Sequence, residues 1–100
     1  MKGRDDKAWV ETDVEELLGL SAEELVIVEF RAALGLALQE ARARLRLTQG
    51  EAAARIGTSQ AQVSKMEAGA ATVTLDRVVR ALVALGMSRA AIVKALGSAA

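Results

Sequence analysis

The feature that most constrains this chain is the regular spacing of residues that begin and end α-helices. A serine or threonine side chain can accept from the free N–H groups of a helix N-terminus, and glycine tolerates the left-handed conformation that ends a helix. These residues predict helices over about 13–18, 22–46, 49–56, 60–68, 75–85 and 89–96, with Ser21, Thr48, Ser59, Thr74 and Ser88 as N-caps. Ser21, Thr48 and Ser59 also carry Glu or Gln three residues later, which is the capping-box pattern.

Composition favours an all-α fold built around a single core. The 100-residue chain has no proline and two aromatic residues, and it is rich in the strong helix formers alanine and leucine. Cysteine and histidine are both absent, which excludes disulfides, zinc-finger ligation and catalysis by either side chain. We therefore expect no enzymatic activity, no metal and no cofactor. The sequence shows neither a signal peptide nor a long apolar run, so we expect a cytoplasmic protein without a membrane partner.

The charges are distributed unevenly along the chain. Residues 1–30 carry three basic and nine acidic side chains, whereas residues 31–100 carry ten basic and four acidic ones. We expect an acidic N-terminal arm with a short helix over 1–20, followed by a basic domain over 21–97. Either the basic domain binds a polyanion, or its charged side chains only lie on solvated helix surfaces.

The long predicted helix carries two apolar stripes at helical spacing. One consists of Phe30, Leu34, Leu38, Ala41 and Leu45, and the other of Leu25, Val28, Ala32 and Leu36. One stripe is enough to close the core, so the second predicts a dimer interface, unless the core wraps the whole helix. Ile92, Val93 and Leu96 of the terminal helix are a second candidate interface, although the core could require them. Gly35, within the long helix, indicates either a close helix contact or a kink.

Residues 42–69 have the pattern of two short helices joined by a tight turn at 56–59. Apolar side chains would face each other across the turn: Ala52, Ala53 and Ile56 on the first helix, Val63 and Met66 on the second. The outer face of the second helix then carries Gln60, Ala61, Ser64 and Lys65, with no acidic side chain. A helix with this face fits the major groove of DNA and can read base edges there.

This window resembles the lambda-repressor/Cro-like (XRE-type) helix-turn-helix family. The matching residues are Arg42, Leu47-Thr48-Gln49, Glu51-Ala52-Ala53, Ile56-Gly57, Ser59-Gln60, Val63-Ser64, Met66-Glu67 and Gly69. The resemblance implies a compact bundle of about five helices, and residues 74–85 are similar to the helix that follows in the family. One departure is Arg46, at a position where glycine is common.

The resemblance also implies which residues bind and what they bind. Gln49 is implied to contact a phosphate, and Gln60, Ala61 and Lys65 to face bases, with Thr58, Ser59 and Ser64 beside them. Arg42 and Glu67 are implied to form an internal ion pair, although Arg42 could instead be one of several solvated arginines. The implied function is a sequence-specific transcriptional regulator, a dimeric repressor that binds an operator in double-stranded DNA and lies on the nucleoid when bound.

A narrower resemblance involves Trp9 and residues 13–21, 65–69 and 74–76. These segments resemble the HigA-like subgroup of antitoxins and autorepressors, which are encoded beside a RelE/HigB-like toxin. The alternative function is therefore a protein-interaction module that neutralises such a toxin, with weak or no DNA binding. The acidic arm could dock on a basic toxin by charge complementarity, or it could only increase solubility.

Overall fold

The computed structural model describes residues 19–97, which form five α-helices and no strand. The helices are α2 (Ala22–Arg44), α3 (Gln49–Ile56), α4 (Gln60–Glu67), α5 (Leu75–Ala84) and α6 (Arg89–Gly97). The prediction of an all-α bundle of about five helices is confirmed. The helix predicted over 13–18, and nearly all of the acidic arm predicted over 1–20, lie outside the described residues. None of the five helices is both long and apolar enough to cross a membrane.

The helices begin at the predicted caps. The hydroxyl oxygens of Ser21, Thr48, Ser59, Thr74 and Ser88 each accept from the backbone N–H three residues later, at 3.1–3.4 Å. At Ser21 and Thr48 the capping box is complete, because the carboxylates of Glu24 and Glu51 accept from the backbone N–H of the capping residue. The box predicted at Ser59 is present only in its first half, the hydrogen bond from the Gln62 N–H.

The long helix ends two residues earlier than predicted, at Arg44. The N–H of Leu47 donates to the Arg42 carbonyl at 3.0 Å, and Arg46 adopts a positive φ of 59°. This is the Schellman arrangement that closes many helices. A left-handed conformation costs a residue with a Cβ about 1–2 kcal/mol, which is why glycine suits this position. Arg46 departs from that preference without changing the fold.

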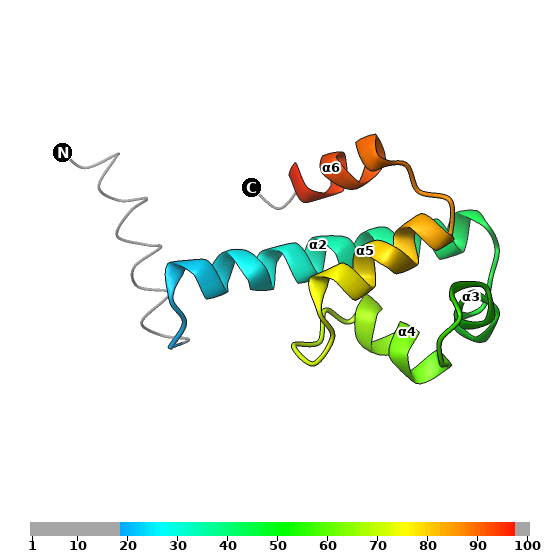
Figure 1. The fold of residues 1–100 in the computed structure, drawn as a ribbon, viewed down its shortest axis with the longest axis horizontal. Helices are drawn as coiled ribbons and strands as arrows, with labels where there is room; N and C mark the ends of the chain where they lie inside the picture. The colour runs from blue at the N-terminus through cyan, green and yellow to red at the C-terminus, as the bar shows by residue number, and fades with distance from the viewer. Residues whose placement is uncertain (1–18, 98–100) are drawn as a thin grey trace.

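The arrangement of the bundle depends on α2, which the other helices contact on different sides. α4 and α6 both pack on α2, and Figure 1 shows them on opposite sides of it, with α5 running alongside. Gly35 lies against α4, and Ala37 lines a hollow between α2 and α6 together with Ala95 of α6. Two residues correspond to about 200° of rotation around a helix, so α2 separates α4 from α6.

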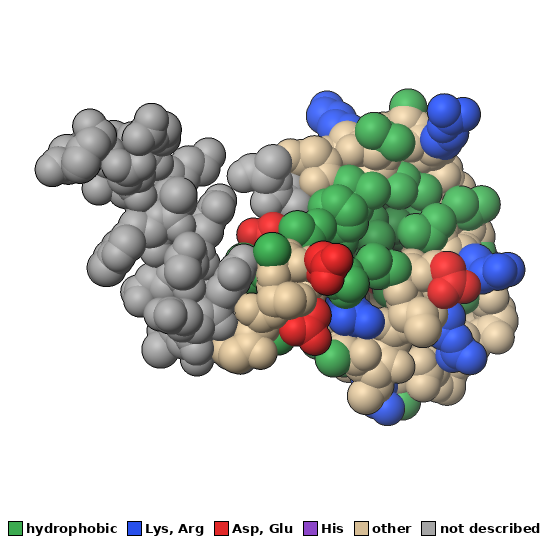
Figure 2. Space-filling model, turned by 60° about the vertical axis from the view of Figure 1, so that its left-hand side comes forward, with side chains coloured by type: hydrophobic (Ala, Val, Ile, Leu, Met, Phe, Trp, Pro, Cys, Tyr) green, Lys and Arg blue, Asp and Glu red, His purple; other side chains and the backbone are tan. Residues whose placement is uncertain are grey.

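Much of the second predicted stripe of α2 stays at the surface. Leu36 is 54% exposed and Val28 45% exposed, Ala32 is exposed and Leu25 half-buried. Figure 2 shows hydrophobic side chains gathered between α2 and α6. For Ile92 of the terminal helix the structure favours the alternative that the sequence left open, because Ile92 is 8% exposed and belongs to the core of its own chain. Leu96 packs against that core, and Val93 alone of the three is exposed.

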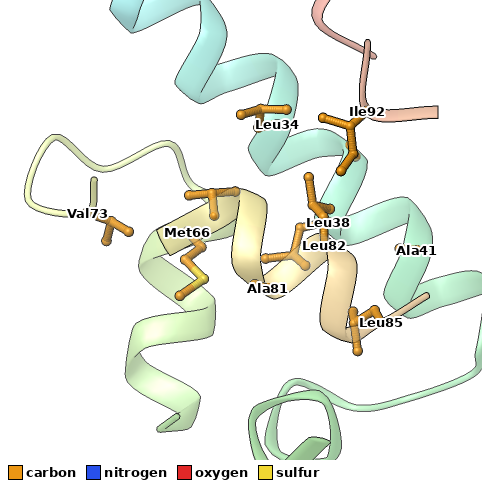
Figure 3. Close-up of a cluster of buried hydrophobic side chains, with 11 residues drawn as sticks. Leu34, Leu38, Ala41, Met66, Val73, Ala81, Leu82, Leu85 and Ile92 are labelled. Atoms are coloured by element: carbon orange, nitrogen blue, oxygen red, sulfur yellow. The ribbon is translucent and has the colours of Figure 1, made fainter. Parts of the chain in front are cut away.

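The core lies where α2, α4, α5 and α6 meet. Leu34 and Leu38 of α2, Met66 of α4, Leu82 of α5 and Ile92 of α6 converge there (Figure 3). The first predicted stripe therefore forms the core through its middle. Its two ends do not take part fully: Phe30 is half-buried, and Leu45, just past the last residue of α2, is exposed.

Gly35 marks the place where α2 and α4 come closest. A Cβ added to it would lie 2.6 Å from the carbonyl oxygen of Met66 and 2.8 Å from that of Glu67. Neither backbone oxygen can move away without shifting the end of α4. The close helix contact, rather than the kink, explains this glycine.

Replacing Gly35 therefore tests the packing directly. We expect Gly35→Ala to lower the free energy of unfolding by about 1–3 kcal/mol through overpacking, despite the roughly 1 kcal/mol that alanine contributes to helix propensity. Gly50→Ala in α3 is the matched control, because the nearest atom to its added Cβ is 3.9 Å away. Urea unfolding of both variants measures the difference, and a Gly35→Ala variant as stable as the native chain would contradict the close contact.

Candidate nucleic-acid interface

The turn between α3 and α4 fixes the two helices at a defined angle. Gly57 ends α3 with a φ of 90°, a backbone conformation that residues with a Cβ rarely adopt. The N–H of Thr58 then donates to the Ala53 carbonyl at 2.9 Å, and Ser59 begins α4. Ala53 and Val63 are buried where the helices face each other. The two short helices are thus a packed helix-turn-helix unit.

One face of α4 points away from the core. Gln60, Ala61, Ser64 and Lys65 are all exposed, as is Ser59 at the cap, whereas Thr58 is half-buried. The opposite face is buried and carries Val63, Met66 and Glu67. The acidic side chain of the helix is therefore turned inward, and the exposed face offers hydrogen-bonding groups and one ammonium.

The buried carboxylate of Glu67 is the centre of a hydrogen-bond network. Arg42 of α2 donates to both of its oxygens, from Nε to Oε2 at 2.6 Å and from Nη2 to Oε1 at 3.1 Å. Gln49 of α3 donates from Nε2 to Oε1 at 3.0 Å. Arg42 Nη1 also donates to the Leu47 carbonyl at 3.1 Å. The network ties together α2, α3, α4 and the turn before α3.

Electrostatics and burial make this network rigid. The Glu67 side chain is 4% exposed and that of Arg42 is 24% exposed, so water screens the pair weakly. The hydrogen bond to Glu67 raises the pKa of the Arg42 guanidinium, although burial of the side chain opposes the rise. Two parallel N–H···O bonds fix the relative orientation of the two groups as well as their distance.

The structure brings together some of the residues that the sequence singled out. Arg42 and Glu67 form the ion pair that the resemblance implied, and Gln60, Ala61, Ser64 and Lys65 share one exposed face. The bond from Gln49 to Glu67 was not anticipated, and Gln49 is half-buried. The sequence offered one clue to it, because a carboxylate has about four acceptor sites and a single arginine does not fill them.

The described part of the chain offers no metal site. No group of three or more acidic side chains in residues 19–97 could hold an ion. Every buried polar side-chain atom in that range also has a hydrogen-bond partner. The polar groups near α4 therefore serve to hold the helices or to face solvent.

A double-mutant cycle tests whether the network holds the unit together. Arg42→Ala should lower the free energy of unfolding by roughly 3–5 kcal/mol, because it leaves a buried carboxylate without its cation. Glu67→Ala should cost less, since Arg42 can turn toward water and keep its bond to Leu47. The double variant should lose clearly less than the sum of the single losses. Strictly additive losses in thermal melts would show that the two side chains are not coupled.

The sequence model of the helix-turn-helix domain matches residues 33–94, more than half of the chain. The match extends from the middle of α2 into α6 and includes the whole network around Glu67. No curated protein and no solved structure matched the chain. The chain belongs to the helix-turn-helix domain family, a family of DNA-binding folds.

Proposed function

We propose that this protein is a sequence-specific regulator of transcription that binds double-stranded DNA, and that it acts as a repressor rather than as an enzyme. The observation that carries the proposal is the exposed face of α4. It presents Gln60, Ala61, Ser64 and Lys65 with no carboxylate. A rigid helix with short polar side chains at its N-terminal end suits the major groove.

The two helices of the unit have different roles in this proposal. α4 reads base edges: Lys65 donates to guanine acceptors, and Gln60 pairs with a base near the start of the helix. Gln49, the first residue of α3, contacts a phosphate. Its amide gives one hydrogen to Glu67 and keeps a second for the phosphate. The positive end of the α3 dipole points to the same place.

The proposed regulator is a homodimer, because a second recognition helix in the next major groove, about 34 Å away, greatly strengthens binding. Figure 1 shows the first turns of α2 extending past α4, α5 and α6. Val26, Ile27 and Val28 are exposed in these turns, and with Leu25 they form the proposed contact. Ala32 and Leu36, the rest of the predicted stripe, line a groove further along α2 and are not part of it. We place the two-fold axis beside this end of α2, so that both α4 helices can face the same DNA.

Two more specific roles are compatible with the same DNA-binding site. An XRE-type autorepressor and a HigA-like antitoxin would both use α4 in the same way. The proposed toxin contact involves the acidic arm, nearly all of which lies outside the described residues. Copurification with the product of a neighbouring toxin-like gene would distinguish the antitoxin from a plain repressor.

The salt dependence of binding to the protein's own promoter tests the DNA proposal. Each neutralised phosphate contributes about −0.9 to the slope of log affinity against log salt, so about four contacts predict a hundredfold loss for a fourfold rise in salt. A gel shift at several salt concentrations measures the slope. A scrambled duplex of equal length is the control and should bind more weakly. Binding that is absent, or that does not change with salt, would refute the proposal.

Two substitutions separate base contacts from phosphate contacts. Lys65→Ala should cost roughly 1–3 kcal/mol on the preferred operator and relax the preference at one base pair in each half-site. Gln49→Ala should weaken binding to all duplexes about equally. Thermal melts must accompany both variants, because Gln49→Ala also removes a hydrogen bond to Glu67. The reverse pattern would mean that α4 and α3 meet the DNA in another orientation.

The proposed dimer contact is tested at Val28. Val28→Glu places a charge in the apolar N-terminal turns of α2, and we expect a folded monomer with much weaker operator binding. Val83→Glu is the matched control, because Val83 is exposed on α5 to a similar degree, 57% against 45%. Sedimentation at micromolar concentration reports the mass. A Val28→Glu dimer would move the interface elsewhere, and a native monomer would remove it altogether.

A further inference from the structure

An apolar groove between α2 and α6 has no role in the DNA-binding unit. It has a volume of about 430 Å³ and is lined by four alanines, by Leu36 and by two glutamates. The alanines are Ala32, Ala33 and Ala37 of α2 and Ala95 of α6. Because alanine side chains are so short, the two helices leave a hollow that Figure 2 shows as a hydrophobic area below α6. Leu36 stands in this hollow, 54% exposed.

The charged lining of the groove has one sign. Glu29 and Glu40 both line it, and no basic side chain does. They are eleven residues apart on α2, which corresponds to about three turns, roughly 16 Å along the helix and nearly the same side of it. The apolar floor therefore lies between two exposed carboxylates. This arrangement fits an apolar surface that carries a cation toward each end.

The groove faces away from α4. Ala37 and Leu36 of its floor lie on a different side of α2 from Gly35 and Arg42, which mark the contact with α4, and Ala32 at the edge of the groove lies beside Gly69, just after α4. A molecule seated in the groove would therefore not cover Gln60, Ala61, Ser64 or Lys65. The groove and the exposed face of α4 can be occupied at the same time.

Two occupants from the same polypeptide fit poorly. Residues 1–18 carry three basic and six acidic side chains, so their net charge has the same sign as the carboxylates of the groove. A second copy related by a two-fold axis through the groove would bring Glu29 and Glu40 toward identical carboxylates. The α4 helices of the two copies would then point in opposite directions and could not contact one DNA duplex. This objection to a second copy rests on the proposed DNA-binding function.

We propose that the groove is a docking site for another protein, which contributes an apolar helix with a lysine or arginine toward each end. The apolar face of that helix covers Leu36 and the four alanines, and its cations pair with Glu29 and Glu40. The partner binds on the side opposite the DNA-reading face, so the protein can hold DNA and this partner together.

A pair of synthetic peptides tests the proposal on the full chain. Both peptides are helical and share one leucine and alanine face. The first carries lysines eleven residues apart beside that face, and the second carries glutamates at the same positions. Fluorescence anisotropy of the labelled peptides measures binding. We expect the lysine peptide to bind at least tenfold more tightly than the glutamate peptide, and the difference to shrink as salt is raised.

Variants of the chain locate the binding. Leu36→Glu, and separately the double change Glu29→Gln and Glu40→Gln, should each weaken the lysine peptide tenfold or more. Val83→Glu and Glu23→Gln are the matched controls, because both positions are exposed and outside the groove. They should leave peptide affinity within twofold. Operator binding of the double glutamine variant should be unchanged, which separates this proposal from the DNA proposal.

The opposite results overturn the inference. Equal affinity for the two peptides, no binding of the lysine peptide at millimolar concentration, or binding that Leu36→Glu leaves intact would each refute it. A native dimer in sedimentation that Leu36→Glu dissociates and Val28→Glu does not would assign the groove to a second copy instead. If operator binding fails while the peptide results hold, the DNA proposal fails and the docking site stands.

Discussion

The buried carboxylate of Glu67 is the interaction on which the described fold most depends. An ionised carboxylate away from water is unfavourable by several kcal/mol unless charged and polar donors compensate for the lost hydration. Arg42 and Gln49 supply three hydrogen bonds to it from two other helices. Those donors reach Glu67 only if α2, α3 and α4 hold one mutual arrangement. The energetic requirement of one side chain thus restrains the geometry of the whole helix-turn-helix unit.

The backbone at the end of α4 imposes a second constraint beside the first. The carbonyl oxygens of Met66 and Glu67 lie so close to Gly35 that no Cβ fits between them and α2. This close approach brings α4 within reach of the Arg42 guanidinium, which lies two turns further along α2. A bulkier residue at position 35 would push α4 outward and lengthen the bonds to Glu67. Packing and electrostatics therefore restrain the same contact, and neither would hold it as well alone.

The sequence predicted the local structure better than the packing between helices. The capping residues and the glycines that end helices are local signals. The capping residues predicted where the helices begin, because a cap needs only a hydroxyl three residues before the backbone N–H that donates to it. The end of α2 was misplaced because its Schellman turn uses Arg46, which gives no glycine signal. Ile92 was assigned to two places at once, interface and core, because periodicity shows that a face is apolar but not what covers it. The bond from Gln49 to Glu67 was missed, since an amide donor can pair with many acceptors.

The difference between the two sides of α2 also follows from the network. On one side of α2, α4 is held by the buried ion pair and by the close contact at Gly35, so α4 has one orientation. The side that packs on α6 is lined with alanines, which leave room between the helices and need no particular partner inside the chain. A rigid face suits the recognition of a fixed shape such as a DNA groove. The hollow face, flanked by two carboxylates of one sign, is complementary to a different kind of surface, and α2 keeps the two apart.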